Sequence, residues 1–508
     1  MSRLNTRTPL SIIKSGLPPF LLDFPSNIST GSVLESRPAW LTNLSANWVA
    51  PVLACGSPAV DAHSARGIND HWETKCNMHN RANKVRVDSS ANTSVQTPRT
   101  TSPISALSFP QRLAGLFRDH WQIICLVLIS LCMHMYVFSF ADRLIYDEKF
   151  WVPEARHILE REPLDWPQYT ALSKLFMTSG IYILGDNPWG WRTPSAIFGV
   201  ASIVLVYLIA RRLAGKRTAL LASLLFTTEN LVFTFSGLAM LDVFAVAFML
   251  LSFLLYLHHR YTLSGLSLAL AVVCSPKVLL AVFAVLAHWF FVRRKRGLRA
   301  IGVFAITSLL AFFILMTITD LTASGQCFNP FHRVVEMWTG QTSIKVSDMT
   351  AESLATAHPT RPWWWILNLR ATLLEPTEFY HRMMITPTIW LLTIPSIAYL
   401  LYRYFFVRKN RNTPRFILLW FSATYLLWIP LELYTDRPLF LFYLLPSMGA
   451  ICIAVAYGIN QAWQRSAKAK GMVLRWSVRA LLILYLVFHV GLFLVLSPLV
   501  APLMRQAT

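Results

Sequence analysis

Charged residues are scarce in this chain. Of its 508 residues only 14% are charged, while 55% are hydrophobic. Soluble globular domains carry about 25% charged residues, so the composition excludes a soluble protein. Several separate apolar runs reach the length of a membrane span. We therefore predict an all-α polytopic membrane protein.

Acidic residues are especially few, since 25 Asp and Glu oppose 46 Lys and Arg, for a net charge of +21. In a soluble protein this excess would suggest a nucleic-acid partner. Here the basic residues gather in short stretches between apolar runs, as the positive-inside rule describes, and no nucleic acid is predicted. We assign these stretches to cytoplasmic turns, at residues 211–217, 293–296, 403–415 and 465–479.

Cysteine forms no recognisable framework. The seven cysteines are scattered and lack metal-ligand spacing, so we expect free thiols and no metal site built from them. No cofactor is predicted, and no residue pattern indicates a divalent metal.

The first 110 residues lack both a hydrophobic period and a signal-peptide pattern. They are rich in Ser, Thr, Asn and Pro. Such a segment cannot bury a core, so residues 1–110 are predicted to be a disordered cytoplasmic extension.

The apolar runs begin after this extension and predict about 11 transmembrane helices within residues 111–508. They lie at residues 121–140, 194–213, 218–226, 240–257, 263–274, 278–291, 300–317, 387–406, 416–431, 438–459 and 480–500. With the basic stretches inside, the N-terminus is cytoplasmic and the C-terminus lies outside. Two long outer loops are then predicted, at about 141–193 and 318–386.

Two adjacent carboxylates, Asp147 and Glu148, follow the first span. Tyr146, Phe150 and Trp151 flank them, and carboxylates among aromatic rings are partly desolvated and more basic. Such a group suits a general base at the outer membrane face.

The order of several motifs resembles the protein O-mannosyltransferases, membrane glycosyltransferases of the GT-C class that take mannose from a polyprenyl phosphate. An Asp-Glu pair opens the first outer loop in that family, as Asp147-Glu148 does here. Further similar stretches are residues 186–192 (DNPWGWR), Ser236 to Asp242 (SGLAMLD), Lys277, residues 358–365 (HPTRPWWW) and residues 437–446 (RPLFLFYLLP).

The resemblance implies a GT-C fold and an inverting transfer of mannose to a hydroxyl acceptor, with Ser or Thr of an exported protein as the expected acceptor. Asp147 would be the base, and Glu148 would position a sugar hydroxyl or pair with a cation. Donor phosphate and sugar would be bound by Lys277, Arg437, Arg192, Asp242 and Tyr443, and the acceptor-side loop would hold His358, Arg361, Trp363 and Trp365. Cations that reach lipid headgroups and an interfacial aromatic belt are the alternative readings of these side chains.

Two departures from the family pattern leave other functions open. The HPPLGK stretch is replaced by residues 169–174 (YTALSK), and Gly237 replaces the arginine of SRxxxLD. One alternative is a GT-C transferase of another sugar onto a lipid or cell-wall glycan, and another is an inactive homologue that acts as an assembly partner. A transporter is disfavoured, because the acids lie at helix ends and no internal repeat is visible.

The second outer loop of about seventy residues is too short for the MIR domain of fungal and animal members. The resemblance is therefore to the bacterial and archaeal type, which lacks that domain.

Overall fold

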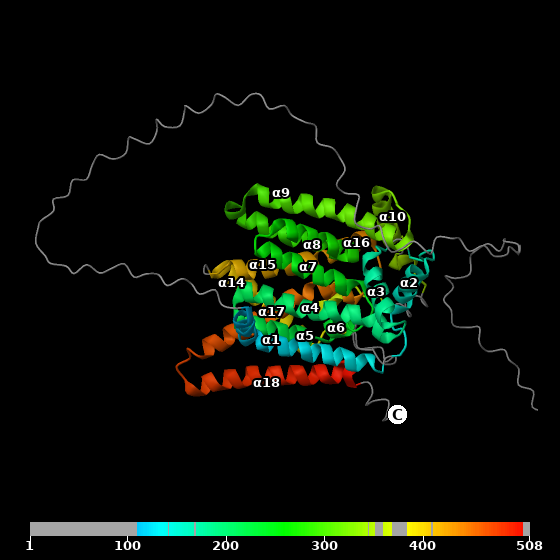
Figure 1. Ribbon diagram of the computed structural model, residues 1–508. Coiled ribbons are helices and arrows are strands. Elements are labelled where there is room, and N and C mark those ends of the chain that lie inside the picture. The colour runs from blue at the N-terminus through cyan, green and yellow to red at the C-terminus, as the bar shows by residue number, and fades with distance from the viewer. Residues whose placement is uncertain are drawn as a thin grey trace, which may run out of the picture. The chain divides into compact units, whose positions relative to one another are not determined.

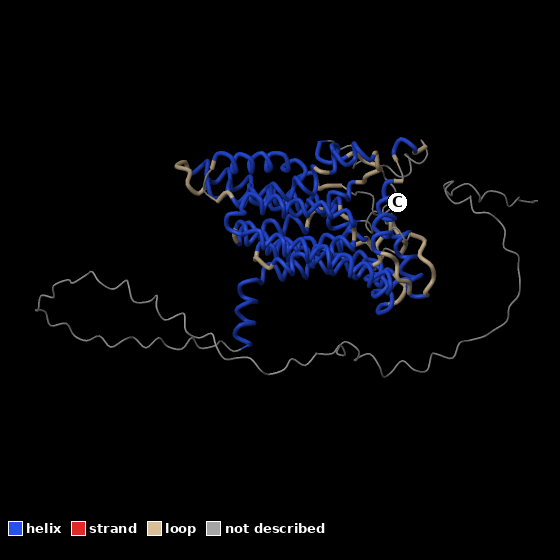
Figure 2. The backbone as a smooth tube through the Cα atoms, turned by 90° about the horizontal axis from the view of Figure 1, so that it is seen from above, coloured by secondary structure: helices blue, strands red, loops and turns tan. Residues whose placement is uncertain are grey.

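A computed structural model describes residues 109–140, 142–166, 169–343, 345–350, 359–367, 384–407 and 410–500. Within these ranges the chain consists of helices and loops, as Figures 1 and 2 show, and the all-α prediction is confirmed there. The predicted disordered extension at residues 1–110 lies almost wholly outside the described residues, and so does His358.

Within the described residues, seven helices are long and apolar enough to cross a membrane, or eight if the bent pair α5 and α6 counts as one span. The seven are Arg118–Phe138 within α1 (Phe109–Phe138), α4 (Pro188–Ala214), Gly297–Ser324 within α9 (Ala281–Ser324), α14 (Pro387–Phe406), Asn412–Thr435 (α15, Asn412–Phe421, to α16, Trp428–Thr435), Leu441–Ser466 (α17, Leu445–Ser466, with the turn before it) and α18 (Met472–Leu496).

Fewer of the described helices are long enough to span a membrane than the eleven or so that the sequence predicted. Three predicted spans are short helices, namely α7 (Leu241–Leu257), α8 (Tyr261–Cys274) and Pro276–Val292. At ~1.5 Å of rise per residue, a helix of 17 residues or fewer is shorter than a ~30 Å hydrocarbon core.

The helix α9 contains one of the predicted cytoplasmic turns. It breaks at Gly297, whose φ of 65° and ψ of 164° are not helical. Glycine adopts this conformation without a Cβ penalty. The break follows the basic residues 293–296, so this segment consists of two helices, as the sequence predicted.

The span α5 (Lys216–Thr227) bends into α6 (Asn230–Ser236) by 64°. Glu229 stabilises this bend, because its buried carboxylate accepts hydrogen bonds from the amides of Val232 at 2.7 Å and Thr386 at 2.9 Å. The amide of Asn230 in turn donates to the Thr386 hydroxyl at 2.9 Å. The bend is thereby fixed to the start of α14.

The core of the bundle surrounds α17, whose most apolar stretch is 94% buried within the protein. Gly449 lets Trp420 of α15 approach closely, since a Cβ at this position would lie 2.6 Å from the indole ring. Trp420 also donates its indole N–H to the Pro446 carbonyl at 2.9 Å. Close packing of this kind fixes the positions of α15 and α17 relative to each other.

The predicted first outer loop contains two helices, α2 (Glu148–Glu160) and α3 (Leu172–Leu184). The 13 residues of α3 are too few for a span, which is why hydropathy did not reveal the helix. α3 lies tightly against α4, because a Cβ on Gly180 would clash with the Gly190 carbonyl at 2.2 Å. In Figure 1, α2, α3 and α10 (Pro330–Thr342) gather at one end of the bundle.

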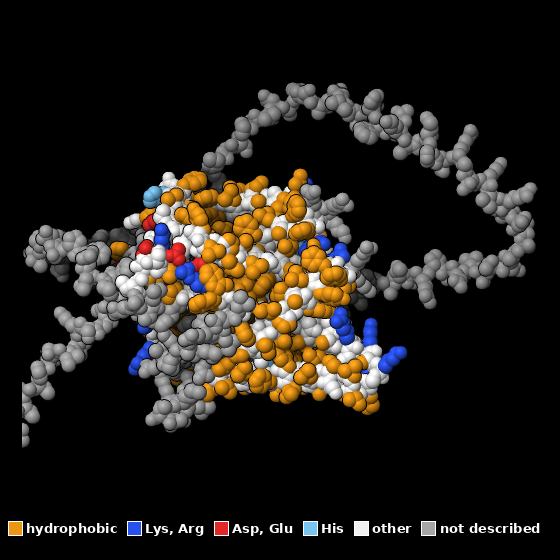
Figure 3. Space-filling view, turned by 180° about the vertical axis from the view of Figure 1, so that it is seen from behind, with side chains coloured by type: hydrophobic (Ala, Val, Ile, Leu, Met, Phe, Trp, Pro, Cys, Tyr) orange, Lys and Arg blue, Asp and Glu red, His pale blue; other side chains and the backbone are white. Residues whose placement is uncertain are grey.

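Charged side chains lie toward the two ends of the bundle on the face that Figure 3 shows. Hydrophobic side chains cover its middle, Lys and Arg appear at both ends, and the acidic side chains in view are grouped at one end. This arrangement suits a bundle that spans a bilayer.

Candidate active site

Glu148 is a buried structural anchor at the start of α2. Its carboxylate accepts hydrogen bonds from Arg192 Nε at 2.8 Å and Arg192 Nη2 at 2.6 Å, and both side chains are fully buried. The amides of Ile145 and Ala239 also donate to it, at 3.0 and 2.8 Å. Of the two roles predicted for Glu148, the structure therefore shows the pairing with a cation.

The Arg192 guanidinium is fully engaged by partners within the protein. Besides Glu148, its Nη2 donates to the Arg143 carbonyl at 2.7 Å. A side chain with no exposed surface and these partners cannot receive a phosphate without breaking the ion pair. The geometry thus favours a structural role for Arg192 over the predicted phosphate contact.

Asp147 lies beside this pair but differs from it. Tyr146, the residue before Asp147, has a φ of 54°, so the chain makes a left-handed turn just before the two carboxylates. Among the described residues, the Asp147 carboxylate has no hydrogen-bond or ion-pair partner, and it is partly exposed. Burial raises the pKa of Asp147 to about 6, while Lys277 lowers it and Asp242 raises it. A free carboxylate with this pKa is suited to accept a proton near neutral pH.

Lys277 faces Asp147 from the turn η2 (Pro276–Leu280), which joins α8 to α9. Its ammonium is 2.8 Å from Asp242 Oδ2, and the Ser275 hydroxyl donates to Asp242 Oδ1 at 2.9 Å. The same nitrogen lies 4.3 Å from the ring centroid of Phe442 and 4.6 Å from that of Tyr443. These contacts hold the cation in place by ion pairing and cation–π attraction.

Arg437 and Tyr169 complete the cluster. Burial raises the pKa of Tyr169, the Tyr443 hydroxyl raises it further, and the charges of Lys277 and Arg437 oppose the shift. Asp147 also acts electrostatically on Tyr169, so Tyr443, Lys277, Arg437 and Asp147 all lie near this side chain. Within the described part of the chain, Arg437 makes no hydrogen bond or ion pair and is half-buried. It is a cation that can take an anionic partner.

The acceptor-side loop is attached next to Arg437. Arg361 pairs with Glu432 and, at 3.1 Å, with Asp436, while the Thr360 amide donates to the Leu439 carbonyl at 2.6 Å. These bonds hold the loop against the chain on both sides of Arg437. Arg361 is therefore engaged by two acids within the protein.

The two predicted tryptophans of this loop have different environments. Trp365 is only 1% exposed, packs against Tyr425 and donates its indole N–H to Thr360 at 2.8 Å. It can hold the loop but cannot touch an acceptor. Trp363 is half-buried beneath the Arg361 guanidinium, at 6.0 Å, and remains accessible.

Lys174, the lysine of the HPPLGK-like stretch, forms a second buried ion pair, which was not predicted from the sequence. It lies 2.6 Å from Glu154, and both side chains are fully buried. Glu154 also accepts from the amides of Asp165 and Trp166. Glu154, His157 and Asp165 could in principle share a metal ion, but both oxygens of Glu154 are already engaged by these donors.

Sequence reasoning missed Ser275, Phe442 and Tyr169 as members of the cluster. Ser275 and Phe442 adjoin predicted site residues, and Tyr169 opens the stretch that replaces HPPLGK. That departure was the one available signal for Tyr169.

Comparison with known proteins bears on the family resemblance and on the fold. Residues 170–319, which contain Asp242 and Lys277, match the family model for dolichyl-phosphate-mannose-protein mannosyltransferase. A polyprenol-phosphate-mannose–protein mannosyltransferase from Corynebacterium glutamicum is 26% identical over 446 residues, covering 70% of this chain and 84% of that protein. The chain is therefore similar in sequence to protein mannosyltransferases. The resemblance inferred from the motifs is thereby confirmed.

A second group of relatives acts on another sugar. An undecaprenyl phosphate-α-4-amino-4-deoxy-L-arabinose arabinosyl transferase from Pseudomonas aeruginosa is 26% identical over 213 residues, covering 39% of this chain and 36% of that protein. Relatives of both kinds carry names of enzymes that use polyprenyl phosphates.

The fold of the chain is that of the GT-C enzymes. The crystal structure of ArnT from Cupriavidus metallidurans bound to undecaprenyl phosphate superposes with a TM-score of 0.50 at 13% identity, covering 77% of this chain and 73% of ArnT. The predicted GT-C fold and the integral membrane location are confirmed.

Proposed function

We propose that this chain transfers mannose from a polyprenyl-phosphate donor to a hydroxyl acceptor, with Ser or Thr of exported proteins as the acceptor. The observation that carries the proposal is an unpaired carboxylate, Asp147, within electrostatic range of Lys277, with Arg437 also near Tyr169. Phe442 links the two sides, because it contacts Tyr146, the neighbour of Asp147, and lies under the Lys277 ammonium. A base for the acceptor and positive charge for the leaving phosphate are what this transfer requires.

In the proposed reaction, Asp147 takes the proton from the acceptor hydroxyl as its oxygen attacks the anomeric carbon of the sugar. The new bond forms on the face opposite the phosphate, so the configuration inverts. The bond between the anomeric carbon and the phosphate oxygen breaks, and its electron pair leaves with the polyprenyl phosphate. Lys277 and Arg437 stabilise this negative charge by charge-assisted hydrogen bonds.

The neighbouring groups support these roles. Asp242 and Ser275 hold Lys277 in position, and Tyr443 packs against its ammonium. Trp363 is the accessible aromatic side chain for an acceptor among the two predicted tryptophans. No step of this mechanism calls for a cofactor or a divalent metal.

The site is proposed to open at the outer membrane face. The basic stretches would then lie in the cytoplasm by the positive-inside rule, with the N-terminus inside and the C-terminus outside. The first 110 residues would form a cytoplasmic extension. Accessibility labelling of cysteines introduced next to Asp147 and next to Arg211, in intact cells, tests this orientation.

A transferase of another sugar onto a lipid or cell-wall glycan is the second candidate. Tyr169 favours it, because this side chain faces the cluster at the position where the mannosyltransferase pattern has histidine. Gly237 is a further difference from the mannosyltransferase pattern. A Cβ at this position would lie 3.3 Å from the His134 ring, so there is little room for the arginine of that pattern.

The experiment that tests the proposal uses purified full-length protein in bilayers with a panel of labelled polyprenyl-phosphate sugars. Transfer of mannose to a Ser/Thr-containing peptide supports the main proposal. Transfer of another sugar to a lipid or glycan supports the second candidate. Folded protein that transfers no sugar would instead indicate an inactive homologue with an assembly role.

A further inference from the structure

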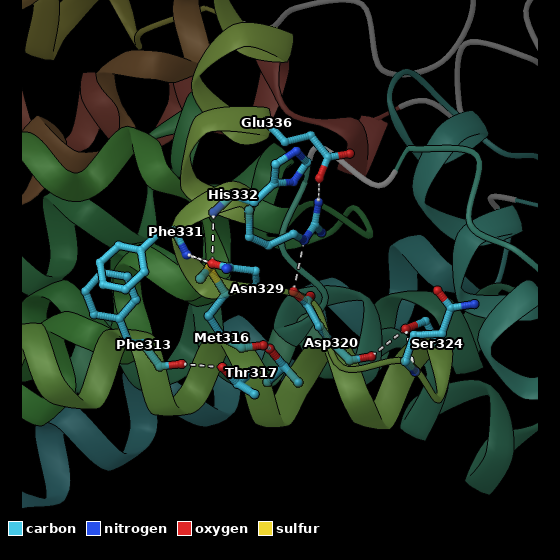
Figure 4. Close-up of polar contacts among 12 residues, drawn as sticks. Phe313, Met316, Thr317, Asp320, Ser324, Asn329, Phe331, His332 and Glu336 are labelled. Carbon is cyan, nitrogen blue, oxygen red and sulfur yellow. Dashed lines mark hydrogen bonds and ion pairs between the residues drawn. The ribbon is translucent and has the colours of Figure 1, made fainter.

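The helix α10 is firmly attached to the end of α9. Arg333 of α10 donates to Asp320 of α9 at 3.0 Å and to Glu336 at 2.9 Å. Figure 4 labels the two acids, with dashed lines at their carboxylates. The side chains of Arg333 and Asp320 are only 4% and 5% exposed. An ion pair this deeply buried fixes the position of the helix, because breaking it would leave an uncompensated charge.

The inner face of α10 also packs against the bundle. Met337 belongs to a buried cluster with Val273 of α8 and Met316 of α9. Val273 lies two residues before Ser275, which hydrogen-bonds to Asp242 in the candidate site. The inner face of α10 is therefore in contact with the helix that leads into the site.

The outer face of α10 carries an apolar stripe. Phe331, Val335 and Trp338 are 72%, 58% and 57% exposed. Their spacing of four and three residues places them on one side of the helix. The exposed polar residues His332 and Thr339 lie on the adjoining side. Three large exposed apolar side chains on a rigid helix need a partner that is itself apolar.

The stripe is continuous with a surface of α9 that faces lipid. The span Gly297–Ser324 is only 11% buried within the protein, and Leu310 and Ile314 are among its exposed side chains. The rings of Phe313 on α9 and Phe331 on α10 lie 5.2 Å apart and are seen together in Figure 4. The contact joins the lipid-facing surface of the span to the stripe of the short helix.

We infer that α10 is an interfacial helix that inserts Phe331, Val335 and Trp338 into the headgroup and upper acyl region of the lipid bilayer. Amphipathic helices lie in this layer with their apolar side inward, and Trp is enriched there. The polar side, with His332 and Thr339, then faces the headgroups and water. On the proposed function, this contact also holds the turn after α8 near the depth at which a lipid-linked phosphate sits.

Photo-crosslinking of the full-length protein in nanodiscs of phosphatidylcholine and phosphatidylglycerol tests the inference independently of activity. The photoreactive residue p-benzoylphenylalanine replaces Trp338 or Val335 in the stripe. Thr339 is the matched control, because it is exposed and adjacent but lies on the polar side. Leu310, 58% exposed on the α9 span, is the positive control. Only variants that elute as a single folded species are compared.

Mass spectrometry should find lipid adducts at positions 335, 338 and 310, with a yield at 339 lower by roughly fivefold or more. Equal yields at 338 and 339 would overturn the inference. Crosslinks from 335 and 338 to a second copy of the chain, in place of lipid, would also overturn it and assign the stripe to a dimer interface. Absence of any adduct at both stripe positions, with adducts at 310, contradicts the inference as well.

Discussion

The carboxylate of Glu148 and the guanidinium of Arg192 form a fully buried, bidentate ion pair immediately beside the unpaired carboxylate of Asp147. Two adjacent acids in the sequence thus have different environments. One is fixed between α2, α4 and the turn before α7, and the other is free for chemistry. This division of roles leads to separate expectations for stability and for activity.

Replacing Glu148 by Gln should destabilise the protein, because the Arg192 charge would remain buried without its counter-ion. Losing one partner of a buried pair costs about 3–5 kcal/mol. We expect a clearly lower midpoint of thermal unfolding in detergent for Glu148→Gln. Asp147→Asn, which breaks no ion pair, is the matched control and should unfold close to wild type. Equal midpoints for Glu148→Gln and wild type would contradict the structural role.

The pH dependence of transfer should report on Asp147. Its pKa is raised to about 6, and the base must be ionised to accept a proton. The value of kcat/KM should therefore fall about tenfold per pH unit below that pKa and level off above it. The measurement is kcat/KM between pH 4.5 and 8.5 in a fixed lipid composition. A flat profile across this range would argue against Asp147 as the base.

Variants of Lys277 and Arg437 should affect the donor. A cation that binds the phosphate in the ground state changes the donor KM, and one that acts as charge develops changes kcat. Arg437→Lys keeps the charge but loses the fork of the guanidinium, so its defect should be smaller than that of Arg437→Ala. Steady-state kinetics in which donor and acceptor are varied separately provide the test for these variants and Lys277→Ala. A change confined to the acceptor KM would remove both residues from the phosphate site.

Tyr169 should influence which donor is used, because its side chain shares a space with Lys277 and Arg437. Tyr169→Phe removes the hydroxyl and should lower kcat/KM for the donor by ~10-fold, the scale of one lost hydrogen bond to a charged group. Tyr182→Phe is the matched control, since Tyr182 is 81% exposed on α3. Tyr169→His, which installs the residue of the family pattern, should shift the preference among donor sugars. Donor kinetics equal to those of wild type in both Tyr169→Phe and Tyr169→His would exclude Tyr169 from the site.

The sequence was informative wherever a signal was local. Motif order led to the family, and Asp147, Lys277, Arg437 and Tyr443 were all predicted as members of one site. The basic residues 293–296 marked a real turn, which the structure completes at Gly297. Such features depend on short segments whose composition is visible in the chain.

Pairings across the fold could not be predicted in the same way. Arg192 and Glu148 are 44 residues apart, and only the packing of α2 against α4 shows that they neutralise each other. The burial of Trp365 likewise depends on Tyr425, which lies on another helix. The short apolar runs were counted as spans, and the helix α3 was missed, because hydropathy measures apolarity while tertiary packing decides where a helix ends.

Single-turnover transfer by Asp147→Asn is the most direct test of the central claim that Asp147 is the base of a polyprenyl-phosphate-dependent sugar transfer. Purified wild type, Asp147→Asn and the control Asp142→Asn, an exposed acid of the same loop, are compared in bilayers with saturating labelled donor and acceptor. We predict that the rate falls by ~10² or more in Asp147→Asn and stays near wild type in Asp142→Asn. A near-normal rate in folded Asp147→Asn would contradict the account.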